Sequence, residues 1–231
     1  AERVRRAPQD LVCWSPKEHL PELQRRPTQE ERTAEQQIYD GPPIPDDISA
    51  KDLDKYARQQ LQGLPEKLAD KVARHLVMAG LLMVEDPEQA YKHALAARAR
   101  ATRSALVREA CGETAYAAGK WSEALSEFRA ARRMSGNQMY AAMMADCERA
   151  LKRPEKAIAY DTPELRMKLD DAGGVELSIV VAGARRDLGQ GEAAVRLLET
   201  EALHTPSRAP WVARLRYAYA DALLDVGRTE D

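Results

Sequence analysis

Residues 105–138 read ALVREACGETAYAAGKWSEALSEFRAARRMSGNQ, and this stretch decides the fold. Its apolar and alanine residues follow helical spacing on both sides of a break at Gly119. The stretch therefore predicts two antiparallel helices joined by a tight turn. Small residues at Gly112 and Ala124 would let the two helices approach each other closely.

An alanine recurs along the chain at the place that Ala124 takes in this hairpin. The intervals between these alanines are 34, 33 and 37 residues, and the four positions are Ala90, Ala124, Ala157 and Ala194. A period in this range is typical of helical solenoids, because one hairpin cannot bury its apolar face alone and must stack on its neighbours. We therefore expect an all-α fold with these alanines buried where helices cross.

The unit at residues 105–138 resembles a tetratricopeptide repeat. The residues that carry the resemblance are Gly112, Gly119, Trp121, Ala124, Phe128 and Ala131. Weaker units lie near residues 71–104, 138–171 and 175–208, and a partial unit near residues 213–231 suggests that the natural protein is longer. The resemblance implies a right-handed α-solenoid of about four and a half helix hairpins. Residues 73–80 and 182–189 are also similar to uncharacterised tetratricopeptide proteins of actinobacteria.

Two of the weaker units carry their own helix signals. Asp86 and Pro87 predict an N-cap and a first helical residue for the second helix of the first unit. Pro154 predicts the start of the second helix of the third unit. We expect that helix to be short, because Asp161 and Glu164 replace the aromatic and alanine residues of the pattern.

Residues 1–45 are rich in proline and charge and show no sustained period, so we expect an extended leader that docks on the solenoid or on a partner. Its apolar anchors would be residues 11–14, with Leu11, Val12 and Trp14, and residues 38–44, with Ile38, Tyr39 and Ile44. The repeat domain then covers residues 46–231. Ser49 and Asp52 resemble a capping box, and they predict a single helix over residues 50–62 that covers the first repeat.

In tetratricopeptide stacks the first helix of each repeat lines a concave groove, through positions 2, 5, 6, 9, 12 and 13. Applied here, the resemblance implies a groove lined by His75, Glu109, Glu113, Tyr116, Met143, Asp146, Arg149, Arg186, Tyr217 and Asp221. Carboxylates outnumber bases in this lining, so we expect a basic or mixed-charge peptide as the ligand instead of a C-terminal carboxylate. The chain's own leader, with Arg3, Arg5 and Arg6, could be the occupant. The alternative is that these charges only pair locally.

Six arginines gather at the ends of two predicted second helices: Arg98, Arg100, Arg103, Arg129, Arg132 and Arg133. Cations are favoured at helix C-termini, so solvated helix ends are one interpretation. A second is a ridge that meets RNA or an acidic partner, which would make the protein a ribosome- or RNA-associated factor. The net charge of −2 gives this alternative little support.

The sequence contains no motif for catalysis, a metal or a cofactor. The four histidines lie in different units, and Cys13, Cys111 and Cys147 show neither a CxxC motif nor a disulfide framework. Cys111 is expected to be a small core residue with an unactivated thiol. No apolar run reaches the length needed to span a membrane. These features predict a cytoplasmic binding protein that is not an enzyme and has no small-molecule substrate.

Overall fold

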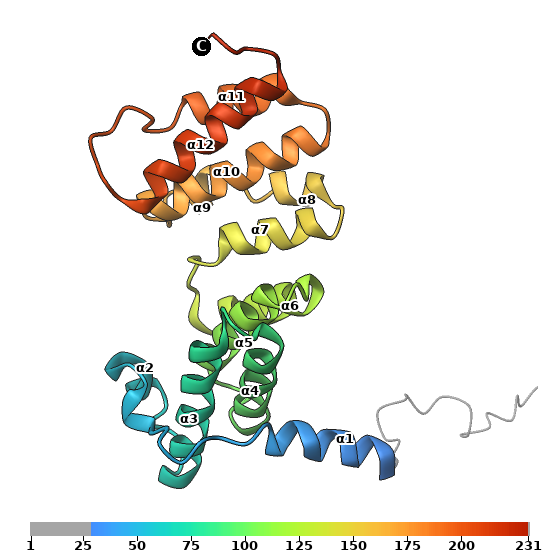
Figure 1. The fold of residues 1–231 in the computed structure, drawn as a ribbon, viewed down its shortest axis with the longest axis vertical. Coiled ribbons are helices and arrows are strands. Elements are labelled where there is room, and N and C mark those ends of the chain that lie inside the picture. The colour runs from blue at the N-terminus through green and yellow to red at the C-terminus, as the bar shows by residue number, and fades with distance from the viewer. Residues whose placement is uncertain (1–28, 231) are drawn as a thin grey trace, which may run out of the picture. The chain divides into compact units, whose positions relative to one another are not determined.

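The structure, a computed structural model, describes residues 29–230 and is all-helical over that range (Figure 1). The helices are α1 (Gln29–Asp40), the short 3-10 helix η2 (Ala50–Asp52), α2 (Lys55–Gln60), α3 (Glu66–Leu82), α4 (Pro87–Arg100), α5 (Ala105–Ala117), α6 (Trp121–Ser135), α7 (Ala141–Ala150), α8 (Pro154–Ile158), α9 (Pro163–Arg166), α10 (Asp171–Asp187), α11 (Gly191–Glu199) and α12 (Pro210–Asp225). A boundary between two units falls between Gln36 and Gln37, inside α1, and every helix after α1 belongs to the unit that begins at Gln37. The predicted all-α class is confirmed for the described residues.

Within the second unit, helices that follow one another in the chain pack side by side. Contacts join α3 to α4, α4 to α5, α5 to α6, α6 to α7 and α7 to α8 (Figure 1). Helix α10 then packs on both α7 and α8, and α12 packs on both α10 and α11. Each long helix is therefore covered by its immediate neighbours, which is how hairpins that cannot bury their apolar faces alone become stable.

Small residues lie where these helices cross. The four periodic alanines are fully buried, as predicted: Ala90, Ala124, Ala157 and Ala194. A Cβ atom added to Gly112 on α5 would lie 2.5 Å from two ring carbons of Phe128 on α6. The Phe128 ring is itself 1% exposed and stacks on Tyr140, with 4.7 Å between ring centroids. The α5–α6 crossing thus depends on the absence of a side chain at Gly112.

The predicted turn at Gly119 is confirmed, and the same backbone conformation recurs after α10 and after α12. Gly119, Gly189 and Gly227 have φ angles of +69°, +73° and +76°, in the left-handed region that glycine adopts without a steric penalty. Lys152 takes the corresponding place between α7 and α8 with a φ of +60°. A lysine is uncommon in this conformation, so the turn geometry is kept there without its usual residue.

The predicted helix starts are confirmed in two places. The Asp86 carboxylate accepts a hydrogen bond from the Gln89 backbone N–H at 3.0 Å, and Pro87 is the first residue of α4. Pro154 begins α8, which ends at Ile158 and is as short as expected. A second short helix, α9, follows it.

Two expectations for the N-terminal part are wrong. Residues 29–40 form the helix α1 and are not extended. Residues 50–62 do not form a single helix. The Ser49–Asp52 capping box is present, but it starts only the 3-10 helix η2, because Asp54 caps a second helix, α2, by accepting from the Tyr56 and Ala57 backbone N–H groups at 2.8 and 3.2 Å.

Residues 37–48 pack on α3 and α4. The Arg74 side chain donates to the carbonyl oxygens of Ile48 and Pro45, at 2.7 and 3.1 Å, and the Arg100 guanidinium lies 4.2 Å from the centroid of the Tyr39 ring. Gly41 comes so close to α4 that an added Cβ would lie 2.4 Å from the Ala96 methyl group. This segment therefore covers the apolar side of the first helix pair.

Only part of the predicted leader can be compared with the structure. Within the second anchor, Ile38 and Tyr39 are 41% and 43% exposed. The first anchor, with Leu11, Val12 and Trp14, and the three leader arginines lie outside the described residues. The hypothesis that the leader occupies the groove therefore stays a prediction.

Candidate functional site

A groove of about 640 Å³ lies among α7, α10, α11 and α12. Its apolar lining comes from Ile179 and Ala182 on α10, Leu198 on α11 and Ala218 on α12. Tyr217 also lines the groove, and its side chain is 77% exposed. Such high exposure is unusual for a large aromatic ring. An apolar floor with an exposed aromatic ring beside it suits the anchoring side chain of a bound peptide.

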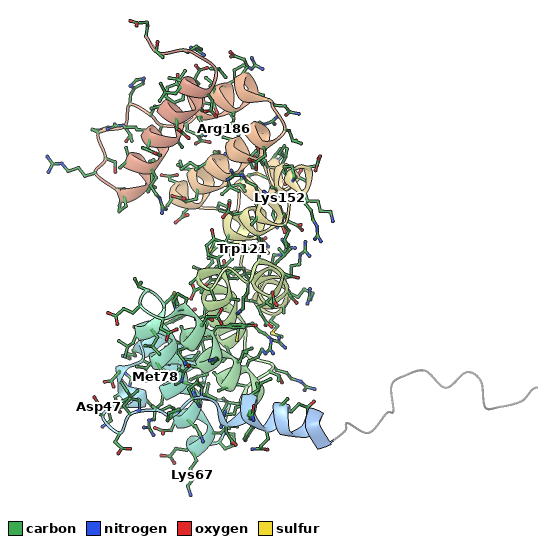
Figure 2. The ribbon with its side chains drawn as sticks, turned by 45° about the vertical axis from the view of Figure 1, so that its right-hand side comes forward. Asp47, Lys67, Met78, Trp121, Lys152 and Arg186 are labelled. Atoms are coloured by element: carbon green, nitrogen blue, oxygen red, sulfur yellow. The ribbon has the colours of Figure 1, made fainter. Side chains whose placement is uncertain are left out.

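Three arginines border this groove, and we call them the arginine ladder: Arg149, Arg186 and Arg214. Arg149 on α7 donates to Asp187 on α10 at 2.5 Å. Arg186 on α10, labelled in Figure 2, pairs with Asp221 at 2.6 Å and with Asp225, both on α12.

The third arginine of the ladder pairs with a carboxylate on an earlier helix, whereas Arg149 and Arg186 pair with carboxylates on a later one. Arg214 on α12 pairs with Glu176 on α10. All of these groups are partly exposed, and ion pairs of that kind contribute about 0–1 kcal/mol each. A ligand can therefore replace one partner by its own charged group at little free-energy cost.

Gly183 is the residue that lets Arg149 cross α10. An added Cβ at Gly183 would lie 2.7 Å from the Arg149 guanidinium carbon. The guanidinium thus lies close to the backbone of α10 where it donates to Asp187. Gly183 therefore determines the position of the Arg149 guanidinium at the edge of the groove.

The predicted acidic residues of α5 and α7 form a separate group outside this groove. The Tyr140 hydroxyl donates to Glu113 at 2.7 Å, and the Tyr116 hydroxyl donates to Asp146 at 2.5 Å. Burial raises the pKa of the Glu113 carboxyl, although the hydrogen bond from Tyr140 works against that shift. These carboxylates are therefore held by phenol groups of neighbouring helices.

Glu109 and Met143 complete this second group. Burial, and then the neighbouring Glu113, raise the pKa of the Glu109 carboxyl. Met143 is half-buried and packs against the core cluster that contains Phe128 and Met144. Of the ten predicted groove residues, Arg149, Arg186, Tyr217 and Asp221 thus lie together in the cavity described above.

His75 was predicted to line the groove, and this prediction is wrong. The side chain is fully buried between α3 and α4, where its Nδ1 lies 3.0 Å from the Nδ1 of His93. Gly41 of the preceding segment lies over the ring, since an added Cβ would be 2.9 Å from the His75 Cε1. His75 is part of the core because residues 37–48 cover the face that the repeat pattern leaves open.

The buried histidine pair predicts that acid destabilises the fold. Burial, followed by the neighbouring His93 and Arg100, lowers the pKa of His75 from 6.5 to about 3, and burial also lowers the pKa of His93. Because the unfolded chain takes up protons first, stability is complete above about pH 6.5 and falls as the pH drops towards 3. At pH 5 we expect His75 to account for a loss of about 2 kcal/mol in the free energy of unfolding.

Urea unfolding at pH 7 and pH 5 measures this loss, with the His75→Gln variant as the comparison. The raised pKa values of Glu109 and Glu113 act in the opposite sense, but they are common to both proteins and cancel in the difference. The variant should lose less stability between the two pH values than the parent protein. Equal losses would show that His75 does not resist protonation in the folded state.

The predicted arginine ridge does not exist as a set of six free cations. Arg98 pairs with the buried Glu127, and Arg129 donates to the buried Glu148 at 2.6 Å. Arg100 donates to the Ala96 carbonyl oxygen at 2.9 Å and lies over Tyr39. These three arginines hold helices together, which leaves Arg103, Arg132 and Arg133 for any partner.

Sequence reasoning missed part of the groove lining. Ile179 stands at position 5 of the unit at residues 175–208, and position 5 is one that the resemblance directs into the groove, so a signal for it exists. Leu198 replaces the second aromatic residue of the pattern, and nothing in the sequence indicates that it reaches the groove floor. Cys111 is buried as expected, and burial raises the pKa of its thiol to about 12.

Among residues 29–230, no three His, Cys, Asp or Glu side chains are placed to hold a metal ion together. In the same range, no helix has both the length and the apolar character needed to cross a membrane. The comparisons with known proteins are negative: no family model, no curated protein and no solved structure matches the sequence. The case for a function therefore depends on the geometry of the groove.

Proposed function

We propose that this chain is a non-enzymatic, cytoplasmic protein-interaction scaffold, built as a right-handed tetratricopeptide solenoid, whose groove binds a peptide segment of a partner. The observation that carries the proposal is the cavity of about 640 Å³ with an apolar floor, the exposed Tyr217 and the arginine ladder. Because rigid helices form the groove before binding, the protein loses little conformational entropy when a segment binds.

Side-chain contacts between successive units support the repeat alignment. With units beginning at residues 138, 175 and 213, Arg149 and Arg186 both stand at position 12, and each pairs with an aspartate at position 13 of the following unit, Asp187 or Asp225. The same ion pair at two successive interfaces is the outcome expected when equivalent helices stack in equivalent ways.

A second contact follows the same rule. Tyr116 stands at position 12 of the unit at residues 105–138, and it donates to Asp146 at position 9 of the next unit. Arg186 at position 12 likewise pairs with Asp221 at position 9. Gly183 takes position 9 in the unit between, and there the Arg149 guanidinium passes over the bare backbone. Position 12 thus reaches into the next unit at each of these interfaces.

The chemistry of the groove indicates the kind of segment it binds. An apolar or aromatic side chain would cover Ile179 and Ala218 and stack on Tyr217. Both charge signs border the floor, in pairs that exchange partners at little cost. We therefore propose a mixed-charge segment, with basic side chains that meet Asp187, Asp221 or Asp225 and acidic ones that meet the arginine ladder.

Selection of binders from a random peptide display library tests this function. The recovered peptides should carry a large apolar residue flanked by charges of both signs. Tyr217→Ala should weaken their binding by about tenfold or more, since truncating an aromatic anchor at an interface costs about 1–2 kcal/mol or more.

Tyr56→Ala is the matched control, because Tyr56 on α2 is 71% exposed and lies outside the groove. Its binding should equal that of the parent chain. Peptides that bind both tyrosine variants equally well would contradict the groove assignment.

A ribosome- or RNA-associated role is the alternative. It has less support, because the structure uses Arg98, Arg100 and Arg129 of the proposed ridge in internal contacts. Loss of RNA binding on replacement of Arg103 and Arg133, without any change in peptide binding, would favour it.

A further inference from the structure

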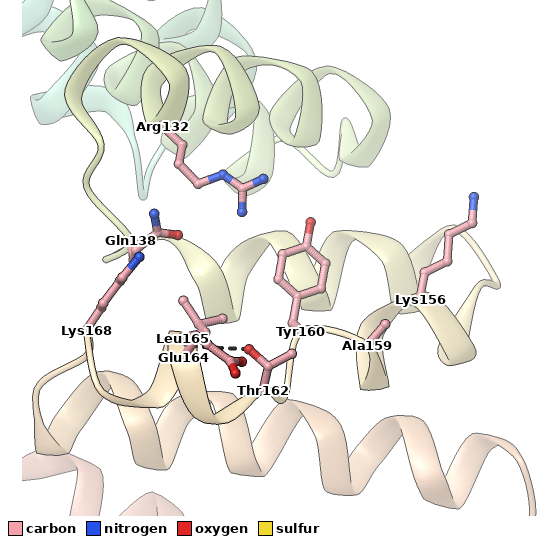
Figure 3. Close-up of a pocket in the computed structure, with 9 residues that line it drawn as sticks. All are labelled: Arg132, Gln138, Lys156, Ala159, Tyr160, Thr162, Glu164, Leu165 and Lys168. Carbon is pink, nitrogen blue, oxygen red and sulfur yellow. Dashed lines mark hydrogen bonds between the residues drawn. The ribbon is translucent and has the colours of Figure 1, made fainter.

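A second cavity, of about 340 Å³, lies away from the groove, between the C-terminal half of α6 and the segment that joins α8 to α9. Figure 3 shows Arg132 of α6 above the cavity and Leu165 and Thr162 below it. Tyr160 points from the α8–α9 segment towards Arg132, and Gln138 and Lys168 stand on the opposite wall (Figure 3). None of these residues lines the proposed peptide groove.

The charge of this cavity is strongly one-sided. Arg132, Lys156 and Lys168 line it, and Glu164 is the acidic residue among its lining residues. Within residues 29–230, these three cations form no ion pair, although the chain as a whole has more acidic than basic residues. One turn earlier on the same helix, Arg129 is paired with the buried Glu148. Unpaired cations gathered from three segments around one cavity favour an anion as its ligand.

Hydroxyl groups on the cavity wall are free to donate. Tyr160 brings its hydroxyl group to the cavity wall, and a phenol hydroxyl can donate its proton to a ligand. The Thr162 oxygen accepts from the Leu165 backbone N–H at 3.2 Å and keeps its own proton. Hydroxyl donors beside guanidinium and ammonium groups match the several acceptor oxygens of a phosphate.

The frame of the cavity is rigid. Tyr160 and Leu165 pack against the core clusters of both α6–α7 and α7–α10, so their positions are set by buried contacts. The volume accommodates one phosphate group with a small body attached to it. A single cluster of cations differs from the long basic track that a nucleic acid strand requires.

We propose that this cavity binds a phosphate monoester, presented either by a phosphorylated side chain of a partner protein or by a small phosphorylated metabolite. Arg132 supplies the planar, two-pronged donor, Lys168 supplies a second charge, and Tyr160 donates its hydroxyl proton. The dianionic form of the ligand is favoured, so binding should strengthen as the pH rises through about 6.

Titration of the whole chain at constant ionic strength tests the proposal, with ribose 5-phosphate and a phosphoserine peptide as probes. Ribose and the unphosphorylated peptide serve as matched probes that lack the phosphate group. Calorimetry should give saturable binding for the phosphorylated probes alone. Tighter binding of the phosphopeptide would identify a protein partner as the source of the phosphate, and tighter binding of ribose 5-phosphate would identify a metabolite.

Arg132→Gln and Lys168→Gln should each weaken this binding about tenfold or more. Arg133→Gln is the control, since Arg133 is the exposed neighbour of Arg132 and does not line the cavity. The proposal is overturned if no phosphorylated probe saturates, or if Arg133→Gln weakens binding as much as Arg132→Gln. It also fails if a single-stranded RNA oligonucleotide binds through Arg132 and Lys168 while neither monophosphate probe does.

Discussion

Replacing Glu127 by glutamine should lower the free energy of unfolding by about 3 kcal/mol. The Glu127 side chain is 6% exposed, and its carboxylate pairs with Arg98 and with Arg108, the latter at 2.7 Å. Glutamine has nearly the same shape, but it would leave without a counter-charge two arginines whose side chains are only 30% and 22% exposed. The contact joins α4, α5 and α6, so the loss should appear as a lower midpoint in urea unfolding.

Glu123→Gln is the control for this prediction. Glu123 lies one turn earlier on α6 and is exposed, so its replacement should change stability by no more than about 0.5 kcal/mol. If the two variants unfolded at the same urea concentration, the Glu127 pairs would contribute nothing to the packing of the three helices.

Gly112→Ala should destabilise the chain by about 2 kcal/mol. The new methyl group would lie 2.5 Å from two carbons of the Phe128 ring, and that ring cannot retreat because it is buried and stacked on Tyr140. Overpacking of this kind costs about 1–3 kcal/mol, against which alanine gains up to about 1 kcal/mol over glycine within a helix. Urea unfolding followed by circular dichroism measures the net change.

Gly80→Ala is the comparison for this prediction, because its effect on the free energy of unfolding should have the opposite sign. Gly80 is exposed on α3, and an added Cβ there meets nothing within 4 Å, so only the gain in helix propensity remains. We expect it to stabilise the chain by about 0.5–1 kcal/mol. A stabilising effect of Gly112→Ala as well would mean that α5 and α6 do not approach each other as closely as described.

The helical class and the main helix crossings could be predicted because they depend on local properties of single residues. A buried alanine at a fixed spacing, a glycine at a turn and a proline at a helix start each act through their own backbone or volume. The full burial of Ala124, the positive φ of Gly119 and the start of α8 at Pro154 were predictable for that reason.

The errors arise where a second segment decides the environment of a residue. His75 has the sequence spacing of a groove residue, but the segment around Gly41 covers it. No periodic pattern in the sequence predicts that contact. Arg98 and Arg129 resemble solvated helix ends until Glu127 and Glu148 are known to be buried, and carboxylates are rarely buried. The predicted helix over residues 50–62 is divided because Asp54 competes with Ser49 as a cap.

The candidate site was predicted in part for the same reasons. Repeat positions place Arg149, Arg186, Tyr217 and Asp221 on one side of successive first helices, and these four do line a common cavity. The sequence could not show that the carboxylates of α5 and α7 are held by Tyr116 and Tyr140, because that depends on how far neighbouring helices are displaced along one another.

The most direct test of the central claim is photo-crosslinking of a display-selected peptide to chains that carry a photoreactive amino acid at the position of Tyr217 or, separately, of Tyr56. The groove between α10 and α12 predicts a covalent peptide adduct from position 217 and none from position 56. An adduct of equal yield at both positions, or at position 56 alone, would contradict a binding site in this groove.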